Sequence, residues 1–183
     1  MTKKVVILLA EGFEEIEAVT PVDVLRRAGA EVILAGIGGM NIQGAHGVSY
    51  QADQALDKLS GDFDMLVIPG GMPGAKNIGE SAKARELAEE MVRASKLVAA
   101  LCAAPVMTLG AWGLLDGRTA TCYPGMEKMF PSTVAFSPER VVMDGNITTS
   151  RGPGTALEFS LALARQLVGE DKARELAEAM LLK

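Results

Sequence analysis

Short runs of aliphatic residues alternate along this chain with longer stretches of helical periodicity, and this alternation restricts the fold more than any other feature. Residues 5–9 (VVILL), 65–68 (MLVI) and 97–101 (LVAAL) are continuous apolar runs without charge. Such runs are typical of parallel strands that are covered on both faces. Because strands that alternate with helices build α/β folds, the sequence predicts an α/β fold, a three-layer sandwich with a mostly parallel central sheet.

The remaining elements are predicted from the same two periodicities. Apolar residues recur at helical spacing over residues 14–28, and residues 40–56 have the pattern of irregular or edge strands. No linker or low-complexity stretch divides the chain, so residues 1–183 are predicted to form a single domain. Further strands are predicted at residues 31–35, 119–123, 141–143 and 147–149, and further helices at residues 81–95, 104–111, from 155 onward and at 171–181.

Charge and hydropathy exclude two classes of partner. The net charge is −5, so we expect neither a nucleic-acid-binding surface nor attraction to an anionic membrane. Residues 97–115 carry no charge and are long enough to span a bilayer. Alanine, glycine, threonine and proline dilute this stretch, so we interpret it as a buried strand followed by a buried helix. The apolar run at residues 5–10 stops at Glu11 and is too short for the hydrophobic region of a signal peptide, and a soluble cytoplasmic protein is expected.

The counts of cysteine and histidine limit the chemistry. Two cysteines cannot form a disulfide scaffold, which favours a reducing compartment. A single histidine excludes a zinc site built on several histidines. No phosphate-binding glycine motif follows the first strand. The sequence therefore predicts neither a metal site nor a cofactor.

Cys102 lies where the strand at residues 97–101 turns directly into a helix, and it is the strongest candidate for a reactive group. Ala100, Ala103 and Ala104 surround it, and such small neighbours allow the tight turn that a nucleophile needs to clear the sheet. The unpaired N–H groups at a helix N-terminus stabilise a thiolate. The alternative is a buried structural cysteine, which is the commonest role of a free thiol.

Two other loops follow predicted strands, and in a parallel sheet these loops meet at one edge. Gly70 and Gly71 offer backbone N–H groups for an oxyanion beside the sulfur, or form a plain turn. In the acidic segment 11–17, most carboxylates are expected to be solvated in the first helical turn. Glu17 differs because its neighbours are apolar, so burial is expected to raise its pKa and fit it for proton transfer.

The other candidate partners for Cys102 are weaker. His46 is expected in a loop after Gly44, away from the strand ends, where most histidines are surface residues. Cys122 is expected in the strand at 119–123 as a small core or edge residue, and nothing in the sequence supports a role as a resolving thiol.

Taken together, these motifs resemble the ThiJ/PfpI superfamily. The matching segments are spread in the family's order over almost the whole chain, at residues 14–17 (EEIE), 21–29 (PVDVLRRAG), 68–71 (IPGG), 99–105 (AALCAAP) and 149–155 (TSRGPGT). The resemblance implies a flavodoxin-like fold and a homodimer. It also implies that Cys102 is the reactive cysteine, that Glu17 is the protonated glutamate hydrogen-bonded to it, and that Gly71 and Ala103 supply backbone N–H donors.

The chain departs from the family pattern at two positions beside the cysteine. Tyr123 stands where many relatives have histidine, and Ala103 stands where protease-type members have histidine. A phenol with an unperturbed pKa of ~10 is a poor base at neutral pH, so protease chemistry is disfavoured. His46 stands where some relatives have an arginine near the dimer interface, so Tyr123 and His46 are supporting residues at most.

Three functions are consistent with these residues. The first is a cofactor-independent glyoxalase or protein deglycase, in which Cys102 attacks methylglyoxal, glyoxal or their adducts on proteins and lactate or glycolate is released. The second is a redox-responsive chaperone or oxidative-stress sensor that acts through oxidation of Cys102 and binds misfolded proteins. The third, an amidotransferase or hydrolase, is disfavoured because no histidine is well placed.

Overall fold

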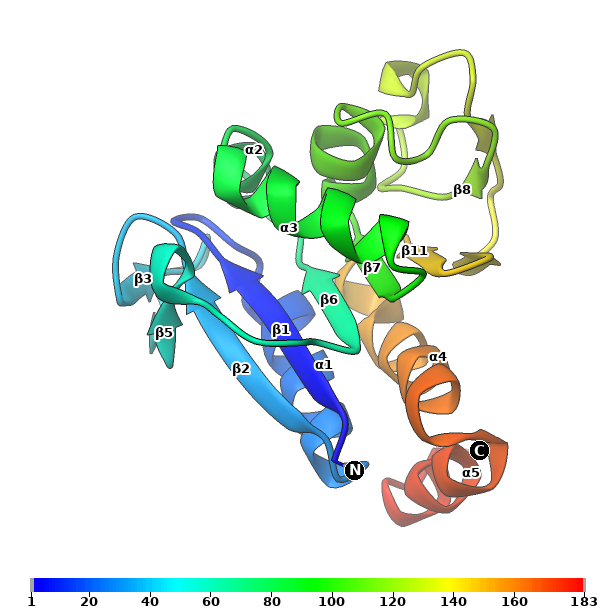
Figure 1. Ribbon diagram of the computed structural model, residues 1–183. Coiled ribbons are helices and arrows are strands. Elements are labelled where there is room, and N and C mark those ends of the chain that lie inside the picture. The colour runs from blue at the N-terminus through cyan, green and yellow to red at the C-terminus, as the bar shows by residue number, and fades with distance from the viewer. Residues whose placement is uncertain (1, 183) are drawn as a thin grey trace.

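The computed structural model describes residues 2–182, and in this range the central sheet has seven strands in the order β10-β11-β7-β6-β1-β2-β5. Neighbouring strands are parallel except for β10 and β11, which are antiparallel (Figure 1). The predicted α/β fold with a mostly parallel sheet is therefore confirmed. The strands of the sheet are β1 (Lys4–Leu9), β2 (Glu31–Gly36), β5 (Gln54–Ala55), β6 (Met65–Ile68), β7 (Leu97–Leu101), β10 (Val141–Asp144) and β11 (Ile147–Ser150).

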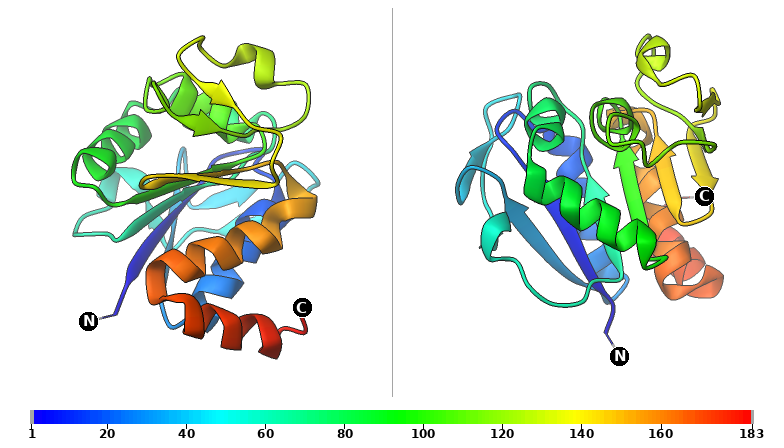
Figure 2. Two further views of the ribbon diagram at one scale, coloured as in Figure 1. Left: turned by 90° about the vertical axis from the view of Figure 1, so that its right-hand side faces the viewer. Right: turned by 45° about the horizontal axis from the view of Figure 1, so that its top comes forward.

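Helices cover both faces of this sheet and complete the three layers (Figure 2). On one face α1 and α4 lie side by side, with α5 packed against α4, while α2, α3 and a short π-helical segment cover the other. The helices are α1 (Glu15–Arg27), α2 (Gly74–Gly79), α3 (Ala82–Arg93), the π-helical segment (Pro105–Gly110), α4 (Ala156–Val168) and α5 (Glu170–Ala179). Within residues 2–182 no helix is both long and apolar enough to cross a bilayer.

The core divides into two clusters because successive side chains of a strand point to opposite faces. Val6 and Leu8 of β1 pack toward α2 and α3. Val5 and Ile7 pack toward α1 and α4. All four are fully buried, and each contributes about 1.5–3 kcal/mol relative to an exposed side chain. The uninterrupted apolar run that predicts this strand therefore follows from burial on both faces.

One short element outside the central sheet differs from expectation. The strand expected at residues 119–123 is limited to β8 (Thr119–Ala120), which pairs with β9 (Ala135–Phe136) in a separate ribbon. Its continuation is prevented because the N–H of Thr121 donates to the Thr149 hydroxyl, 3.0 Å away. Cys122 is therefore buried beyond the strand rather than in it. A second ribbon, β3 (Asn41–Gln43) with β4 (Ser49–Gln51), lies within the region expected to form edge strands.

The order of the strands determines where a ligand can bind. Strand β1 has β2 on one side and β6 on the other, so the chain leaves β1 and β6 in opposite directions. In open α/β sheets a crevice opens at such a switch point, at the carboxyl ends of the strands. The loops after β1, β6 and β7 all lie at this edge, and they contain the three candidate segments.

Candidate active site

Cys102 follows β7 in a strained backbone conformation. Its φ angle is 64°, in the left-handed region that residues other than glycine, asparagine and aspartate rarely occupy. The N–H of Cys102 donates to the carbonyl of Ser150, 2.9 Å away, and its own carbonyl accepts from the N–H of Tyr123 at 2.8 Å. These bonds to two flanking segments hold the turn, and strain of this kind is frequent at functional sites.

The turn has room only for small neighbours. A Cβ atom added to Gly70 would lie 2.6 Å from the Cβ of Cys102 and 2.6 Å from a carboxylate oxygen of Glu17. The glycine at this position therefore allows the β6 loop to approach both side chains. The π-helical segment that follows, Pro105–Gly110, corresponds to the helix expected at residues 104–111, and π-helical turns are frequent at functional sites.

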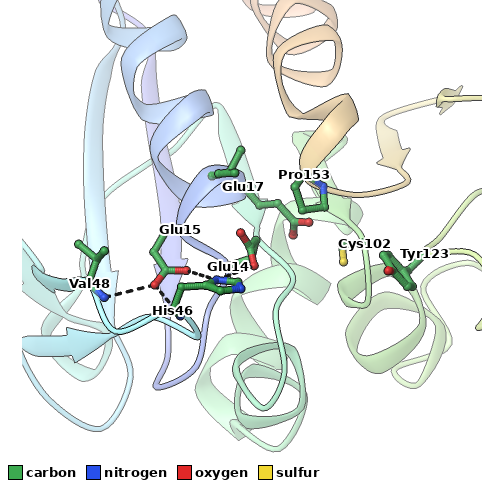
Figure 3. A pocket seen from close by; sticks show the side chains of 9 residues that line it. Glu14, Glu15, Glu17, His46, Val48, Cys102, Tyr123 and Pro153 are labelled. Atoms are coloured by element: carbon green, nitrogen blue, oxygen red, sulfur yellow. Dashed lines mark hydrogen bonds and ion pairs between the residues drawn. The ribbon is translucent and has the colours of Figure 1, made fainter.

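Glu17 is brought to Cys102 by the first turn of α1. Its side chain is fully buried, and the N–H of Gly70 donates to its Oε2 at 2.9 Å. Burial raises the pKa of Glu17 to about 7, although hydrogen bonds with Cys102 and Gly70 act in the opposite direction. The expected desolvated carboxyl is thus present and lies at the sulfur (Figure 3).

The thiol of Cys102 is not the low-pKa group that its place at a helix start suggested. Burial, followed by the charge of Glu17 and the hydrogen bond with it, raises the pKa of Cys102 to about 12. The N–H groups of Gly71 and Ala103 donate to the sulfur and lower the pKa, but less strongly. Two buried acids in contact cannot both be charged at moderate cost. Glu17 and Cys102 therefore share one proton near neutral pH.

A cavity of about 510 Å³ opens in front of this pair (Figure 3). Tyr123, of which 47% is exposed, and Pro153 form the wall nearest to Cys102. Gly152 lies against this wall, since a Cβ atom on it would be 3.4 Å from the Tyr123 ring and 3.8 Å from Oε1 of Glu17. The remaining lining residues are Glu14, Glu15, Ile16, His46 and Val48.

The opposite side of the cavity corrects three expectations. Glu14 and Glu15 are only 9% exposed, although solvated carboxylates were expected. Ile16, an apolar neighbour of Glu17 that was expected to lie on the buried face of the helix, is 54% exposed. His46 lines the same cavity as Cys102 rather than lying away from the strand ends. The cause is the loop between β3 and β4, which folds back onto the start of α1 through hydrogen bonds such as Ala45 N–H to Phe13 O at 2.8 Å.

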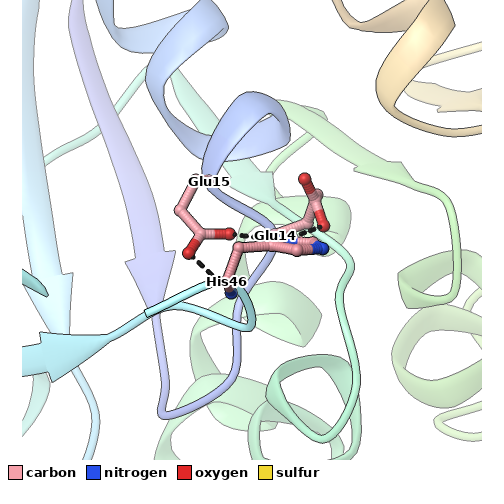
Figure 4. A group of neighbouring side chains, drawn as sticks. All are labelled: Glu14, Glu15 and His46. Atoms are coloured by element: carbon pink, nitrogen blue, oxygen red, sulfur yellow. Dashed lines mark hydrogen bonds and ion pairs between the residues drawn. The ribbon is translucent and has the colours of Figure 1, made fainter. Parts of the chain in front are cut away.

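His46 contacts both carboxylates (Figure 4). Its Nδ1 lies 3.0 Å from Oε2 of Glu15 and 3.3 Å from Oε2 of Glu14. The hydrogen bond with Glu15 and the negative charge of both carboxylates raise the pKa of His46. Sequence reasoning missed this group because its members come together only through a long-range contact, although the run of acidic residues was visible.

Gly71, Ala103 and Tyr123 lie around Cys102. Gly70 was expected to donate its N–H to an oxyanion, but in the structure it donates to Glu17. Sequence reasoning did not identify Gly152 and Pro153 as residues of the site. A signal was available, because the segments 68–71 and 149–155 both follow strands that end at the edge where Cys102 lies.

Comparison with known proteins identifies the family of the chain. Residues 3–166 match the sequence model of the DJ-1/PfpI family. Protein DJ-1 homolog B of Arabidopsis thaliana is 40% identical over 185 residues, which cover 100% of this chain and 42% of that protein. Glutathione-independent glyoxalase DJR-1.2 of Caenorhabditis elegans is 34% identical over 178 residues, which cover 97% of this chain and 95% of that protein.

A solved structure extends the similarity to the fold. The crystal structure of Drosophila melanogaster DJ-1beta has a TM-score of 0.96 at 38% identity, with 100% of both chains covered. The flavodoxin-like architecture is thereby confirmed. The chain spans less than half the length of the Arabidopsis relative. On sequence and structure together, this chain belongs to the DJ-1/PfpI family.

Proposed function

We propose that the protein is a cysteine-dependent glyoxalase or protein deglycase that acts on methylglyoxal, glyoxal or their adducts on proteins. The observation that carries this proposal is the contact between Glu17, whose pKa is raised to about 7, and the sulfur of Cys102. A nucleophile and a proton carrier in direct contact are what an internal proton shift between two carbon atoms requires. The name of the nematode relative supports the same reaction class.

The first step is the attack of sulfur on the aldehyde carbon. The Cys102 proton passes to Glu17, a C–S bond forms and the aldehyde oxygen becomes an alkoxide. The N–H groups of Gly71 and Ala103, which donate toward the sulfur, lie beside the atom that develops this charge and stabilise it. Glu17 returns the proton to the alkoxide, which gives a hemithioacetal and restores the Glu17 carboxylate.

The second step moves a proton within the bound substrate. The Glu17 carboxylate removes the proton from the former aldehyde carbon, and the resulting enediol is protonated at the neighbouring carbon. The product is a thioester of Cys102 with lactic acid, or with glycolic acid when glyoxal is the substrate. Water then hydrolyses the thioester, which releases the acid and restores the thiol. All atoms derive from substrate and one water, so the reaction needs no cofactor.

The cavity supports small aldehydes as substrates and leaves room for a larger adduct. Its volume of about 510 Å³ exceeds what methylglyoxal occupies, and the cavity reaches from Cys102 to the acidic group around His46. We place Tyr123 and His46 as supporting residues at its two sides. We further propose that the protein works as a homodimer in the cytoplasm, without a nucleic-acid or membrane partner.

The test is lactate production by the purified protein from methylglyoxal. Cys102→Ser and Glu17→Ala are each expected to reduce kcat/KM by at least about 100-fold, because general acid–base catalysis contributes about that much. Cys122→Ser is the matched control, since it changes the other buried thiol, and it is expected to retain wild-type activity. Wild-type rates in both Cys102→Ser and Glu17→Ala would refute the mechanism.

A second candidate function is a redox-responsive chaperone or stress sensor. The supporting observation is that Cys102 opens to the cavity, with 9% of the residue exposed, whereas Cys122 is fully buried. Peroxide converts such a thiol to a sulfenic and then a sulfinic acid. The N–H groups of Gly71 and Ala103 and a protonated Glu17 are positioned to donate to the added oxygens. Protection of an unfolded client by the peroxide-treated but not the reduced protein tests this function.

A further inference from the structure

The group formed by Glu14, Glu15 and His46 has the composition and spacing of a metal site. One carboxylate oxygen from each glutamate and one imidazole nitrogen lie within 4.8 Å of one another. In a tetrahedral site with metal–ligand distances of about 2.0–2.2 Å, neighbouring ligand atoms are separated by about 3.3–3.6 Å. The observed Nδ1–Oε2 distances are 3.0 and 3.3 Å, so a metal ion fits with small shifts of the exposed His46 ring.

The charge of this group is not balanced within the described part of the chain. Among residues 2–182, His46 is the only basic side chain that forms an ion pair with Glu14 or Glu15. Both carboxylates are only 9% exposed, and they lie close enough to repel one another through water-poor surroundings. A protonated imidazole supplies one positive charge against two negative ones. A dication restores neutrality.

The orientation of Glu15 is fixed by other contacts. Its Oε1 accepts hydrogen bonds from the backbone N–H groups of His46, at 2.8 Å, and Val48, at 3.3 Å. Its Oε2 is therefore held toward Nδ1 of His46. Metal-binding carboxylates are commonly oriented by such outer hydrogen bonds. Because these donors belong to the backbone, the orientation persists when the imidazole is removed.

A third carboxyl group lines the same cavity. Glu17 is fully buried, and in the described structure its Oε1 has no hydrogen-bond partner apart from the Cys102 thiol. Glu17 lines the cavity together with the three residues of the group (Figure 3). A buried oxygen left without a donor costs free energy. Water that enters the cavity supplies such a donor, and it is available to complete the coordination of an ion held by the group.

We propose that Glu14, Glu15 and His46 bind a divalent transition metal through two carboxylate oxygens and Nδ1, with Zn²⁺ as the representative ion. Mixed imidazole and carboxylate donors suit Zn²⁺ and its neighbours better than Ca²⁺ or Mg²⁺, which prefer oxygen alone. Three protein ligands leave positions open for water on the side of the cavity. This site is separate from the Glu17–Cys102 pair, and the proposed reaction does not require it.

Isothermal titration of the purified, chelator-treated protein with ZnCl₂ tests this site directly. Wild type is expected to bind one equivalent, and His46→Ala, Glu14→Gln and Glu15→Gln are each expected to weaken binding at least about tenfold. Glu11→Gln, which makes the same charge change at an exposed position of the same loop, is the matched control and should bind as wild type does. Titration with MgCl₂ is expected to show no comparable binding.

Two results would overturn the proposal. One is wild-type affinity in both His46→Ala and Glu15→Gln. The other is loss of the bound equivalent in Cys102→Ser with retention in His46→Ala, which would place the ion on the thiol. His46 is mostly exposed and the glutamine variants keep the side-chain shape, so folding is expected to survive and can be confirmed by circular dichroism. Titration with metal requires no turnover. A negative titration would therefore refute the metal site without bearing on the glyoxalase proposal, and a negative lactate assay would refute the glyoxalase proposal without bearing on the metal site.

Discussion

The carboxyl group of Glu17 on α1 lies beside the sulfur of Cys102 at the end of β7, and the charge of Glu17 raises the pKa of that thiol. Both groups are buried, so a negative charge on one raises the pKa of the other. The pair therefore behaves as one unit that loses its first proton near neutral pH and its second at much higher pH. Reactivity depends on how that single negative charge is divided between oxygen and sulfur.

The pH dependence of lactate formation follows from this shared proton. Because the pKa of Glu17 is about 7, kcat/KM is expected to rise about tenfold per pH unit below pH 7 and to level off above it. The pKa of Cys102 is about 12, so no second limb is expected below about pH 10. Rates are measured in buffers containing EDTA, which keeps metal ions away. A profile that is flat between pH 5 and pH 8 would contradict this assignment.

Because its pKa is raised on folding, Glu17 lowers the free energy of unfolding when it is ionised above neutral pH. Its pKa rises from an ordinary 4.5 to about 7 on folding, so the folded state binds the proton more tightly. The resulting stabilisation is complete below pH 4.5 and is lost as pH rises through 7, a difference of about 3 kcal/mol at most. Glu17→Gln is therefore expected to unfold at higher denaturant concentration than wild type at pH 8.

Comparison across pH separates this effect from a general change in packing. The advantage of Glu17→Gln in free energy of unfolding should shrink between pH 8 and pH 5, as wild-type Glu17 becomes protonated. Glu90 is exposed, and Glu90→Gln is the control in which no such trend is expected. An advantage of Glu17→Gln that is equal at both pH values would show that burial of charge is not its cause.

Much of this arrangement could be predicted from local sequence. The strands at residues 65–68 and 97–101 match β6 and β7, because burial on both faces leaves an apolar run. Cys102 stood out because it is a reactive residue in a turn of small residues. Glu17 stood out because it is a carboxylic acid among apolar neighbours on a helix. Such conflicts are where functional residues are expected.

The parts that could not be predicted depend on contacts between distant segments. Glu14 and Glu15 form an ordinary acidic first turn until the loop that carries His46 folds over them. Gly44 permits this, because a Cβ atom there would lie 2.4 Å from Oε1 of Glu15. In the same way, Thr149 takes the N–H of Thr121 and ends β8 early. The pattern of residues within each segment alone does not indicate these contacts between segments.

The close approach of the β6 loop to the catalytic pair gives a steric prediction. Gly70→Ala places a Cβ atom 2.6 Å from both the Cys102 Cβ and the Glu17 Oε2, so it is expected to destabilise the fold by about 1–3 kcal/mol and to reduce kcat/KM. Gly154→Ala is the matched control, since nothing lies within 4 Å of the added Cβ atom. Urea titration and the lactate assay measure both effects. Equal behaviour of the two variants would refute the steric role of Gly70.

The two cysteines are expected to differ in oxidation because only one opens to the cavity. Cys102 is 9% exposed and lines the cavity, whereas Cys122 is fully buried. Mild peroxide should therefore add oxygen to Cys102 at least about tenfold faster than to Cys122, as access controls thiol oxidation. Peptide mass spectrometry over a time course measures both rates in one sample. In Glu17→Gln a neutral amide replaces the carboxyl group, so no negative charge opposes ionisation of Cys102. The thiolate should therefore form more readily, and oxidation of Cys102 should be faster than in wild type. Equal rates at Cys102 and Cys122 would exclude the redox-sensor function and leave the glyoxalase mechanism to be judged on lactate formation alone.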